Sequence, residues 1–306
     1  MPGGPTVDLL DELLARCAFP PAGATLCAAV SGGPDSSALV ALAVHADLDV
    51  EAVHVDHALR AGSAAEAEVV AGTAARLGAR FRSVRVEVAP GPDLEARARA
   101  ARHAALPDDA AFGHTLDDQA ETVLGNLLRG AGLPGAAAMR PEPRHPILRL
   151  RRAETEAVCA ALGLEVVRDP SNHDPAHQRN RLRHEVLPLL GDVAGRDVAP
   201  LLARHGDHAA RALDHLRDEA AAAVPDPTDA RAVAAAPPLL AGLAVHDWLR
   251  RCSPVGHPPD AGAVDRVLAV AEGRAVATEV AGGWRVCRTG QRLRLEPPGA
   301  AGQRPL

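Results

Sequence analysis

A short segment rich in glycine and hydroxyl groups, Ser31-Gly-Gly-Pro-Asp-Ser-Ser37, carries the clearest chemical signal in the chain. Glycines let backbone N–H groups converge, and the N-terminus of a following helix favours an anion. Apolar residues 24–30 precede the segment and helix-forming residues 36–44 follow it, which is typical of a phosphate-binding loop between a strand and a helix. A capped turn is the weaker interpretation. We expect the whole loop to contact nucleotide phosphates: Ser31, Gly32, Gly33, Pro34, Asp35, Ser36 and Ser37.

Two familiar phosphate motifs are excluded. The loop lacks the Gly-Lys-Ser/Thr ending of a Walker P-loop, and all 33 basic residues of the chain are Arg. The G-x-G-x-x-G pattern of dinucleotide-binding folds is also absent. Because the chain contains no Lys, catalysis through a lysyl-AMP or a Schiff base on the protein is excluded as well.

Paired carboxylates form a second candidate site in Gly113-His-Thr-Leu-Asp-Asp-Gln-Ala-Glu-Thr122. Asp118 and Glu121 are three residues apart, so on a helix they share one face. Acids in a first helical turn also stabilise the helix dipole, which is the purely structural explanation. His114 and Thr115 add polar groups at the same strand end. The two carboxylates can therefore hold a cation, and the residues alone leave open whether it is Mg²⁺ or a substrate ammonium.

A third polar group, His54-Val-Asp-His57-Ala-Leu-Arg60, follows an apolar stretch. We expect its polar side chains to emerge at the carboxyl edge of a sheet, beside the phosphate loop. A metal site there is disfavoured, because the spacing offers no convincing third ligand.

The elements that position these groups alternate between strand and helix. Strands are predicted over residues 24–30, 50–55, 81–88 and 110–113, and helices over 36–44, 64–77, 94–105 and 117–129. A further helix-strand unit is predicted over 154–167. This alternation predicts an α/β fold with a doubly wound, Rossmann-like parallel sheet and a ligand at the carboxyl ends of its strands.

The later part of the chain has a different character. From about residue 179 to 223 the pattern is nearly continuous helix, then prolines interrupt it, and residues 275–295 alternate around Gly282-Gly283 as in a terminal hairpin. We therefore predict a catalytic domain over 1–192 and a mainly helical domain over 193–306 that ends in a β-hairpin.

Composition excludes several classes of protein. A net charge of −6 argues against indiscriminate binding of polyanions, so any nucleic-acid contact must be local. The five cysteines include no C-x-x-C pair, which disfavours a disulfide framework or a zinc site. No uncharged apolar run reaches membrane-spanning length and the N-terminus lacks a basic region, so we expect a cytoplasmic protein with no membrane contact.

Six sequence blocks together resemble the tRNA(Ile)-lysidine synthetases, a family of PP-loop ATP pyrophosphatases, from the loop through Leu190. These blocks are S-G-G-P-D-S at Ser31, H-V-D-H-x-L-R at His54, H-x-x-D-D-Q-A-E-T at His114, N-L-L-R-G at Asn126, D-P-S-N at Asp169 and R-N-R-L-R-H at Arg179. The chain departs from the family pattern at His103, Thr115 and Leu116, and none of these departures removes a charged group.

The resemblance implies a two-step reaction on the isoleucine tRNA with a CAU anticodon. The C2 oxygen of the wobble cytidine attacks the α-phosphate of ATP, and the ε-amine of free L-lysine then displaces AMP. Asp35 would serve catalysis and hold Mg²⁺, while Asp118 and Glu121 would receive lysine, with one carboxylate acting as base.

The resemblance also implies roles for several other side chains. His57 and His114 would border the nucleotide. Arg102 and Arg129 would contact cytosine or AMP. The three alternating residues Arg179, Arg181 and Arg183 would contact tRNA phosphates, although a solvated charged face is the alternative.

Other functions remain open on the loop alone. A PP-loop tRNA thiolation enzyme would need paired cysteines, and an amidating NAD or GMP synthetase would lack the blocks at 169 and 179. A nucleotide sensor without catalysis would leave Asp118 and Glu121 idle. The sequence does not determine the oligomeric state, and a homodimer is compatible with it.

Overall fold

The computed structural model describes residues 4–56, 63–86, 97, 101, 104–167, 174–252 and 259–298. Two predicted site residues, His57 and Arg102, and the block at 169–172 lie outside these residues. The chain divides into an N-terminal unit (Met1–Ala131 with Gly135–His208) and a C-terminal unit (Gly132–Pro134 with Ala209–Leu306). The main point of division falls inside α10 (Ala199–Ala223), later than the predicted boundary at residue 192.

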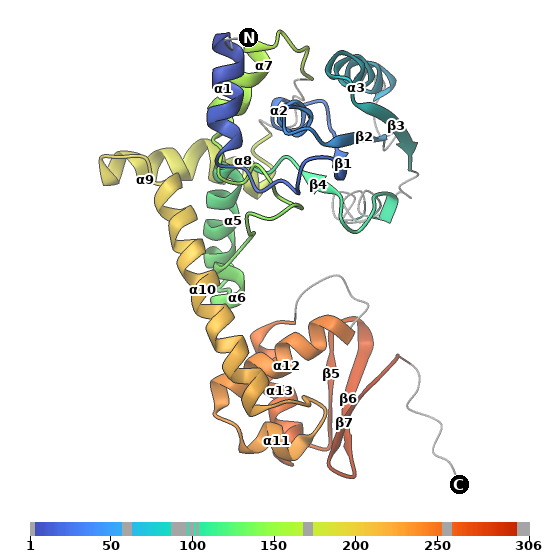
Figure 1. Cartoon of the computed structure of the whole chain (residues 1–306). Coiled ribbons are helices and arrows are strands. Elements are labelled where there is room, and N and C mark those ends of the chain that lie inside the picture. Colours follow the sequence, from blue (N-terminus) through green and yellow to red (C-terminus); the bar gives the residue numbers. More distant parts are fainter. Residues whose placement is uncertain are drawn as a thin grey trace. The chain divides into compact units, whose positions relative to one another are not determined.

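A four-stranded parallel sheet forms the centre of the N-terminal unit (Figure 1). Its strands are β1 (Thr25–Ala29), β2 (Asp49–Asp56), β3 (Arg80–Arg85) and β4 (Ala111–Phe112), and their order is β3-β2-β1-β4. The predicted parallel α/β fold is confirmed. Because the chain builds outward from β1 to β3 and then adds β4 on the opposite side, the strand order reverses between β1 and β4. Ligands of open α/β sheets bind at the carboxyl ends of the strands at such a point.

The two faces of the sheet pack against different groups. Leu26 and Val50 belong to the main core, which also includes buried residues of α1 (Pro5–Leu14), α2 (Pro34–His45) and α7 (Arg152–Ala161). Val53 points to the other face and packs with Leu106 and Ala110. This alternation follows the two-residue period of a strand, and packing on both faces explains the nearly continuous apolar sequence of β1.

Helix α2 lies at the centre of the main core. Its residues from Ser36 to Ala43 are all buried, and it packs against α1, α7 and α3 (Ser63–Leu77). A helix that is apolar all round is expected in such a fully buried position. The phosphate loop directly precedes α2, so this packing fixes the loop in place.

The remaining helices of this unit carry the acidic and basic residues of interest. They are α5 (Leu116–Leu128), the short α8 (Gln178–Arg181), a π-helical turn (Leu182–Val186) and α9 (Leu187–Ala194), and α6 (Leu133–Ala136) follows α5. Residues 164–167 form no strand. Instead, the Val167 N–H donates to the Gly32 carbonyl at 2.8 Å.

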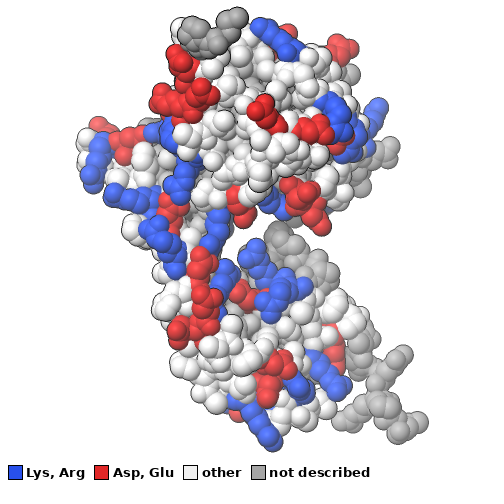
Figure 2. Space-filling model, viewed as in Figure 1, with Lys and Arg blue, Asp and Glu red and all other residues white. Residues whose placement is uncertain are grey.

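The C-terminal unit has its own core around α11 (Ala230–Ala235), α12 (Pro238–Cys252) and α13 (Ala261–Ala271). The predicted terminal hairpin is one part of a three-stranded antiparallel sheet: β5 (Ala277–Val280), β6 (Trp284–Thr289) and β7 (Arg292–Glu296). Gly282-Gly283 lies in the turn between β5 and β6. Arg residues are interspersed with acids over the face shown in Figure 2. No helix among the described residues is long and apolar enough to cross a bilayer.

Candidate active site

The phosphate loop runs from the end of β1 to the first turn of α2. The Ser31 N–H donates to Ser36 Oγ at 3.2 Å, and Ser36 Oγ donates to the Gly33 carbonyl at 3.0 Å. Gly33 is the N-cap of α2 and Pro34 occupies its first turn. The predicted strand, loop and helix are therefore present, and the helix N-terminus supplies the partial positive charge that attracts an anion. Ser37 is buried one turn further in, and its hydroxyl has no partner among the described residues.

Two glycines allow the close approach of backbones around this loop. Gly32 has φ +84°, and a Cβ there would lie 2.7 Å from Val167 Cγ2. A Cβ on Gly113, which follows β4, would lie 2.8 Å from the Asp35 carbonyl oxygen. Both positions therefore require glycine. The loop after β4 consequently lies directly against the phosphate loop, at the point where the strand order reverses.

His54 does not emerge at the sheet edge as the sequence pattern predicted. Its side chain is buried, and Nδ1 lies 2.9 Å from the Val30 carbonyl oxygen. Because a carbonyl only accepts, Nδ1 carries the proton and donates it. His54 thus supports the end of β1 immediately before the phosphate loop. The polar pattern does not reveal this position, because His54 lies inside β2 and is covered there. Asp56, two residues later at the strand end, is only partly buried.

Asp35 occupies the first turn of α2 and faces α7. The Thr155 hydroxyl donates to its carboxylate, and Arg152 Nε lies 3.5 Å from Asp35 Oδ2. Burial raises the pKa of Asp35 to about 6, although the Thr155 hydrogen bond opposes the shift, and nearby Asp118 adds to it. Asp35 is therefore a carboxylate in an environment that penalises its negative charge, which a cation would relieve.

Helix α5 begins with a capping box that holds Asp118. The N–H and hydroxyl of Thr115 donate to Asp118 Oδ2 at 2.8 and 2.9 Å, and the Asp118 N–H donates back to the Thr115 hydroxyl at 3.4 Å. The departure from the family motif at Thr115 thus has a local structural role. One oxygen of Asp118 is committed to the helix cap, and the other, Oδ1, points toward the basic residues of α7 and α8.

Three guanidinium groups surround Asp118 and Glu121. Arg179 donates to Glu121 from Nε and to Asp118 from Nη2, both at 2.8 Å. Arg183 Nε donates to Glu121 at 2.6 Å, and Arg152 Nη2 donates to Asp118 at 3.0 Å. The side chain of Glu121 is 1% exposed and that of Asp118 is 8% exposed. The predicted carboxylate pair is therefore brought together, but arginines of the same chain neutralise it.

Arg152 joins this cluster to the phosphate loop. Its guanidinium contacts Asp35, Asp118 and Glu121, and its backbone N–H donates to Asp117 at 2.8 Å. Neither Arg152 nor Thr155 lies in one of the sequence motifs that predict site residues. Neither role was predictable from spacing, because both depend on α7 packing against α2 and α5.

The cluster sets the charge of Asp118. Burial alone would raise its pKa, but Arg179 and Arg152, together with the Thr115 backbone hydrogen bond, lower it to about 2. Asp118 therefore stays ionised at neutral pH. Of two neighbouring carboxylates, Asp35 has a raised pKa and Asp118 a lowered one, because the guanidinium groups contact Asp118 more closely.

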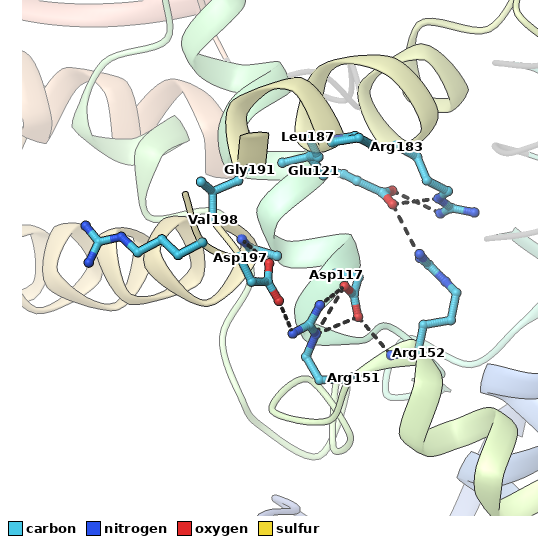
Figure 3. Close-up of a pocket in the computed structure, with 12 residues that line it drawn as sticks. Asp117, Glu121, Arg151, Arg152, Arg183, Leu187, Gly191, Asp197 and Val198 are labelled. Atoms are coloured by element: carbon cyan, nitrogen blue, oxygen red, sulfur yellow. Dashed lines mark hydrogen bonds and ion pairs between the residues drawn. The ribbon is translucent and has the colours of Figure 1, made fainter. Parts of the chain in front are cut away.

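A pocket of about 520 Å³ opens beside the cluster (Figure 3). Glu121, Arg152 and Arg183 line one part of it, with their side chains turned toward one another. Arg151 lies further along and pairs with Asp117 at 2.8 Å and with Asp197 at 2.5 Å. Groups of both charges therefore line this pocket, which suits a ligand that carries both charges itself.

The other predicted residues lie apart from the carboxylate pair. Arg129 ends α5 and donates to Asn126 at 2.6 Å, and Arg181 pairs with Glu185 at 3.1 Å on the exposed side of its helix. His114 Nδ1 lies 3.1 Å from His145 Nδ1. Burial, with the charges of His114 and Arg144, lowers the pKa of His145 to about 4, so the His145 ring is neutral at pH 7 and its nitrogen can accept a hydrogen bond from His114. No group of three metal ligands occurs among the described residues.

Comparison with known proteins places this geometry in a family. A family model described as a PP-loop domain matches residues 10–190. A tRNA(Ile)-lysidine synthase of Nocardia farcinica is 46% identical over 245 residues, which cover 76% of this chain and 77% of the relative. A tRNA(Ile)-lysidine synthase of Rhodococcus erythropolis is 48% identical over 185 residues, which cover 58% of this chain and 57% of the relative.

One solved structure supports the fold. The U34-tRNA thiolase of Methanococcus maripaludis, with its 4Fe-4S cluster, is 16% identical, has a TM-score of 0.51 and covers 67% of this chain and 78% of that chain. The sequence matches identify the family more specifically than the fold does, because one of them spans three quarters of both chains. The chain belongs to the PP-loop family and, within it, to the tRNA(Ile)-lysidine synthases.

Proposed function

We propose that this chain is an ATP-dependent ligase that joins free L-lysine to C2 of the wobble cytidine in the isoleucine tRNA with a CAU anticodon. The observation that carries the proposal is the contact of Arg152 with both Asp35 and the Asp118–Glu121 pair. Through Arg152, a site for ATP directly adjoins a site for a cationic amine. A two-step reaction needs this adjacency, because the activated cytidine must meet lysine before water hydrolyses it.

The phosphate loop would perform the first step. The C2 oxygen of cytosine attacks the α-phosphorus of ATP, a C–O–P linkage forms, and the bond to the leaving pyrophosphate breaks. The N-terminus of α2 would stabilise the charge on the phosphates, and a phosphate oxygen would satisfy the buried Ser37 hydroxyl.

Asp35 fits the requirements of a Mg²⁺ ligand. Mg²⁺ in phosphate sites is held by one or two carboxylates and by the substrate phosphates, so a full protein ligand set is not needed. The raised pKa of Asp35, caused first by burial, indicates a carboxylate that a nearby cation would stabilise. The ion would neutralise charge on the phosphates, and Asp35 with Thr155 would hold it beside the loop.

The carboxylate pair would act in the second step. The lysine ε-nitrogen, as the free amine, forms a bond to C2, the C2–O bond breaks, and AMP leaves with that oxygen. One carboxylate of the pair takes up the proton that the nitrogen releases. Asp118, whose pKa is lowered to about 2 despite its burial, holds a proton poorly and so suits the anchoring of an ammonium. The pocket beside Glu121 would receive the α-amino and α-carboxylate groups of lysine.

Binding of tRNA is proposed to use local arginines, in keeping with the net charge of −6. Arg181 and Arg129 are candidates because both side chains are accessible. Cytoplasmic location and a homodimer stay predictions.

The assay that tests the function uses the full chain, Mg-ATP, labelled lysine and transcripts of the isoleucine and methionine tRNAs with CAU anticodons. We expect label in the isoleucine tRNA alone, with release of AMP and pyrophosphate. Asp35→Asn should lower the rate by about 10²-fold or more, the usual effect of removing a group that stabilises transition-state charge. Asp109→Asn, the same change at an exposed turn, should leave the rate unaltered. Label in neither tRNA, or equally in both, would contradict the proposal.

A further inference from the structure

We propose that Arg179 occupies, in the ligand-free protein, the place that the ammonium of lysine takes during the reaction, and that a phosphate group must draw Arg179 away before lysine binds. The inference rests on the proposed function. The phosphate is supplied by either ATP or tRNA, and the experiment below separates these sources.

All four oxygens of the Asp118–Glu121 pair already accept hydrogen bonds. Asp118 Oδ2 accepts from Thr115, and Asp118 Oδ1 accepts from all three arginines. Glu121 Oε1 accepts from Arg183 and Arg152, and Oε2 accepts from Arg179 and Arg183. An ammonium needs at least one of these oxygens, so one guanidinium must leave when lysine arrives.

The positive and negative charges of this cluster are equal in number. Three guanidinium groups, from Arg152, Arg179 and Arg183, face three carboxylates, from Asp35, Asp118 and Glu121. A lysine ammonium added to this balanced cluster would leave a buried excess of positive charge, which is costly. Replacement of one guanidinium by the ammonium keeps the balance.

Of the three guanidinium groups, that of Arg179 is held least firmly. The side chain of Arg179 is 43% exposed, whereas those of Arg152 and Arg183 are 23% and 22% exposed. Arg152 also contacts Asp35, and its backbone is tied to Asp117. Arg179 lies on the four-residue helix α8, directly before a π-helical turn, and such turns are frequent at functional sites. Arg179 is therefore the cation that moves at least cost.

A phosphate group is the anion that can draw Arg179 away. Arg179 donates one hydrogen bond to each of two carboxylates, so it needs an equally good partner elsewhere, and arginine binds phosphate in a bidentate manner. ATP bound to the loop and the tRNA backbone both present phosphates. If Arg179 moves to such a phosphate, the phosphate ligand and lysine bind cooperatively, and by linkage each strengthens the other equally.

The experiment measures the affinity of labelled lysine for the full chain in three arms: protein alone, protein with Mg²⁺ and a non-hydrolysable ATP analogue, and protein with the isoleucine tRNA transcript. We expect wild-type protein to bind lysine about tenfold more tightly in at least one ligand arm, within the usual range of coupling between sites. The arm that responds identifies the source of the phosphate.

Arg179→Gln removes the competing charge and keeps polar groups on the side chain. This variant should bind lysine without nucleotide or tRNA about tenfold more tightly than wild type, and added ligand should bring little further gain. Arg80→Gln is the matched control for the protein-alone arm, because Arg80 pairs with Asp49 at 2.9 Å on the surface of the same unit, outside the cluster. It should bind lysine as wild type does.

Two outcomes overturn the inference. One is a wild-type protein whose lysine affinity is the same in all three arms, and this result needs no variant to fold. The other is a folded Arg179→Gln protein that binds lysine no better than wild type. If the wild type synthesises lysidine and either outcome occurs, the inference alone has failed, whereas absence of lysidine from the wild-type reaction contradicts the proposed function.

Discussion

Asp118 shows how far the surroundings of a single residue can alter its chemistry. Asp118 is buried and Asp35 is partly buried, and burial by itself raises the pKa of both carboxyl groups. The net shifts have opposite signs because Asp118 lies against Arg179 and Arg152 at hydrogen-bond distance, whereas Arg152 lies 3.5 Å from Asp35. A lowered pKa in the folded state links the charge of Asp118 to stability.

The pH dependence of stability should report this linkage. Because the folded pKa of Asp118 is about 2 and lies below its value in the unfolded chain, its stabilisation is present above about pH 4 and is lost as pH falls through about 2. The shift corresponds to about 2 kcal/mol. We expect Asp118→Asn to lower the free energy of unfolding by about that amount at pH 7 and by almost nothing at pH 2. Urea titrations monitored by circular dichroism at several pH values measure both.

Asp109→Asn serves as the control for this prediction, because Asp109 is exposed in a turn of the same unit. Its effect should be small at every pH. A difference between wild type and Asp118→Asn that stays constant from pH 7 to pH 2 would contradict the link between Asp118 ionisation and stability.

At the scale of residues, the sequence identified acidic groups better than their partners. The sequence predicted that Asp118 and Glu121 share one face of a helix, because that face depends only on nearby residues, and the catalytic roles of Asp35, Asp118 and Glu121 stay predictions. Arg152 and Thr155 were not predictable, because the contact of Thr155 with Asp35 joins residues 120 positions apart. The inward position of His54 depends on strand register, which a polar pattern at a strand end does not reveal.

At the scale of elements, the start of α5 has a particular importance, because its cap also holds Asp118. We expect Thr115→Ala to lower the free energy of unfolding by about 1–2 kcal/mol, the usual cost of losing an N-cap side chain. Thr122→Ala is the matched control on the same helix. The Thr122 hydroxyl donates only to the Asp118 carbonyl, which is an acceptor within the helix, so its loss should cost less than about 0.5 kcal/mol. Equal losses for the two variants in urea unfolding would show that the cap contributes nothing special.

Local pattern predicted the elements best where they are long and regular. The observed β1, α2, β2, α3 and α5 lie close to the ranges expected from apolar periodicity. The strand expected within 154–167 was wrong for residues 164–167, because Val167 bonds to Gly32 and joins no strand. The π-helical turn was not predictable from local pattern, and its buried Leu182 lies beside Gly125 of α5, far away in the sequence.

At the scale of the whole molecule, each of the two units has a main core of its own among the described residues. Leu39 is fully buried in the core of the N-terminal unit, and Leu249 is 2% exposed in that of the C-terminal unit. Each unit therefore has the apolar interior that a cooperative folding unit needs. Composition adds a useful property: the chain has two Trp residues and no Tyr, and Trp248 and Trp284 both belong to the C-terminal unit.

Tryptophan fluorescence should therefore report unfolding of the C-terminal unit alone, whereas calorimetry detects both units. A non-hydrolysable ATP analogue at 100 times its Kd should stabilise the N-terminal unit by about 2.7 kcal/mol. This gain raises the corresponding calorimetric Tm by about 5–10 °C and leaves the fluorescence midpoint unchanged.

Two core variants serve as controls. Leu249→Ala should lower the fluorescence midpoint and preserve the response to nucleotide. Leu39→Ala should lower the Tm of the calorimetric transition that nucleotide raises. If nucleotide raises the fluorescence midpoint as much as the calorimetric Tm, the two units unfold together in one cooperative transition. The prediction of independent unfolding would then be wrong.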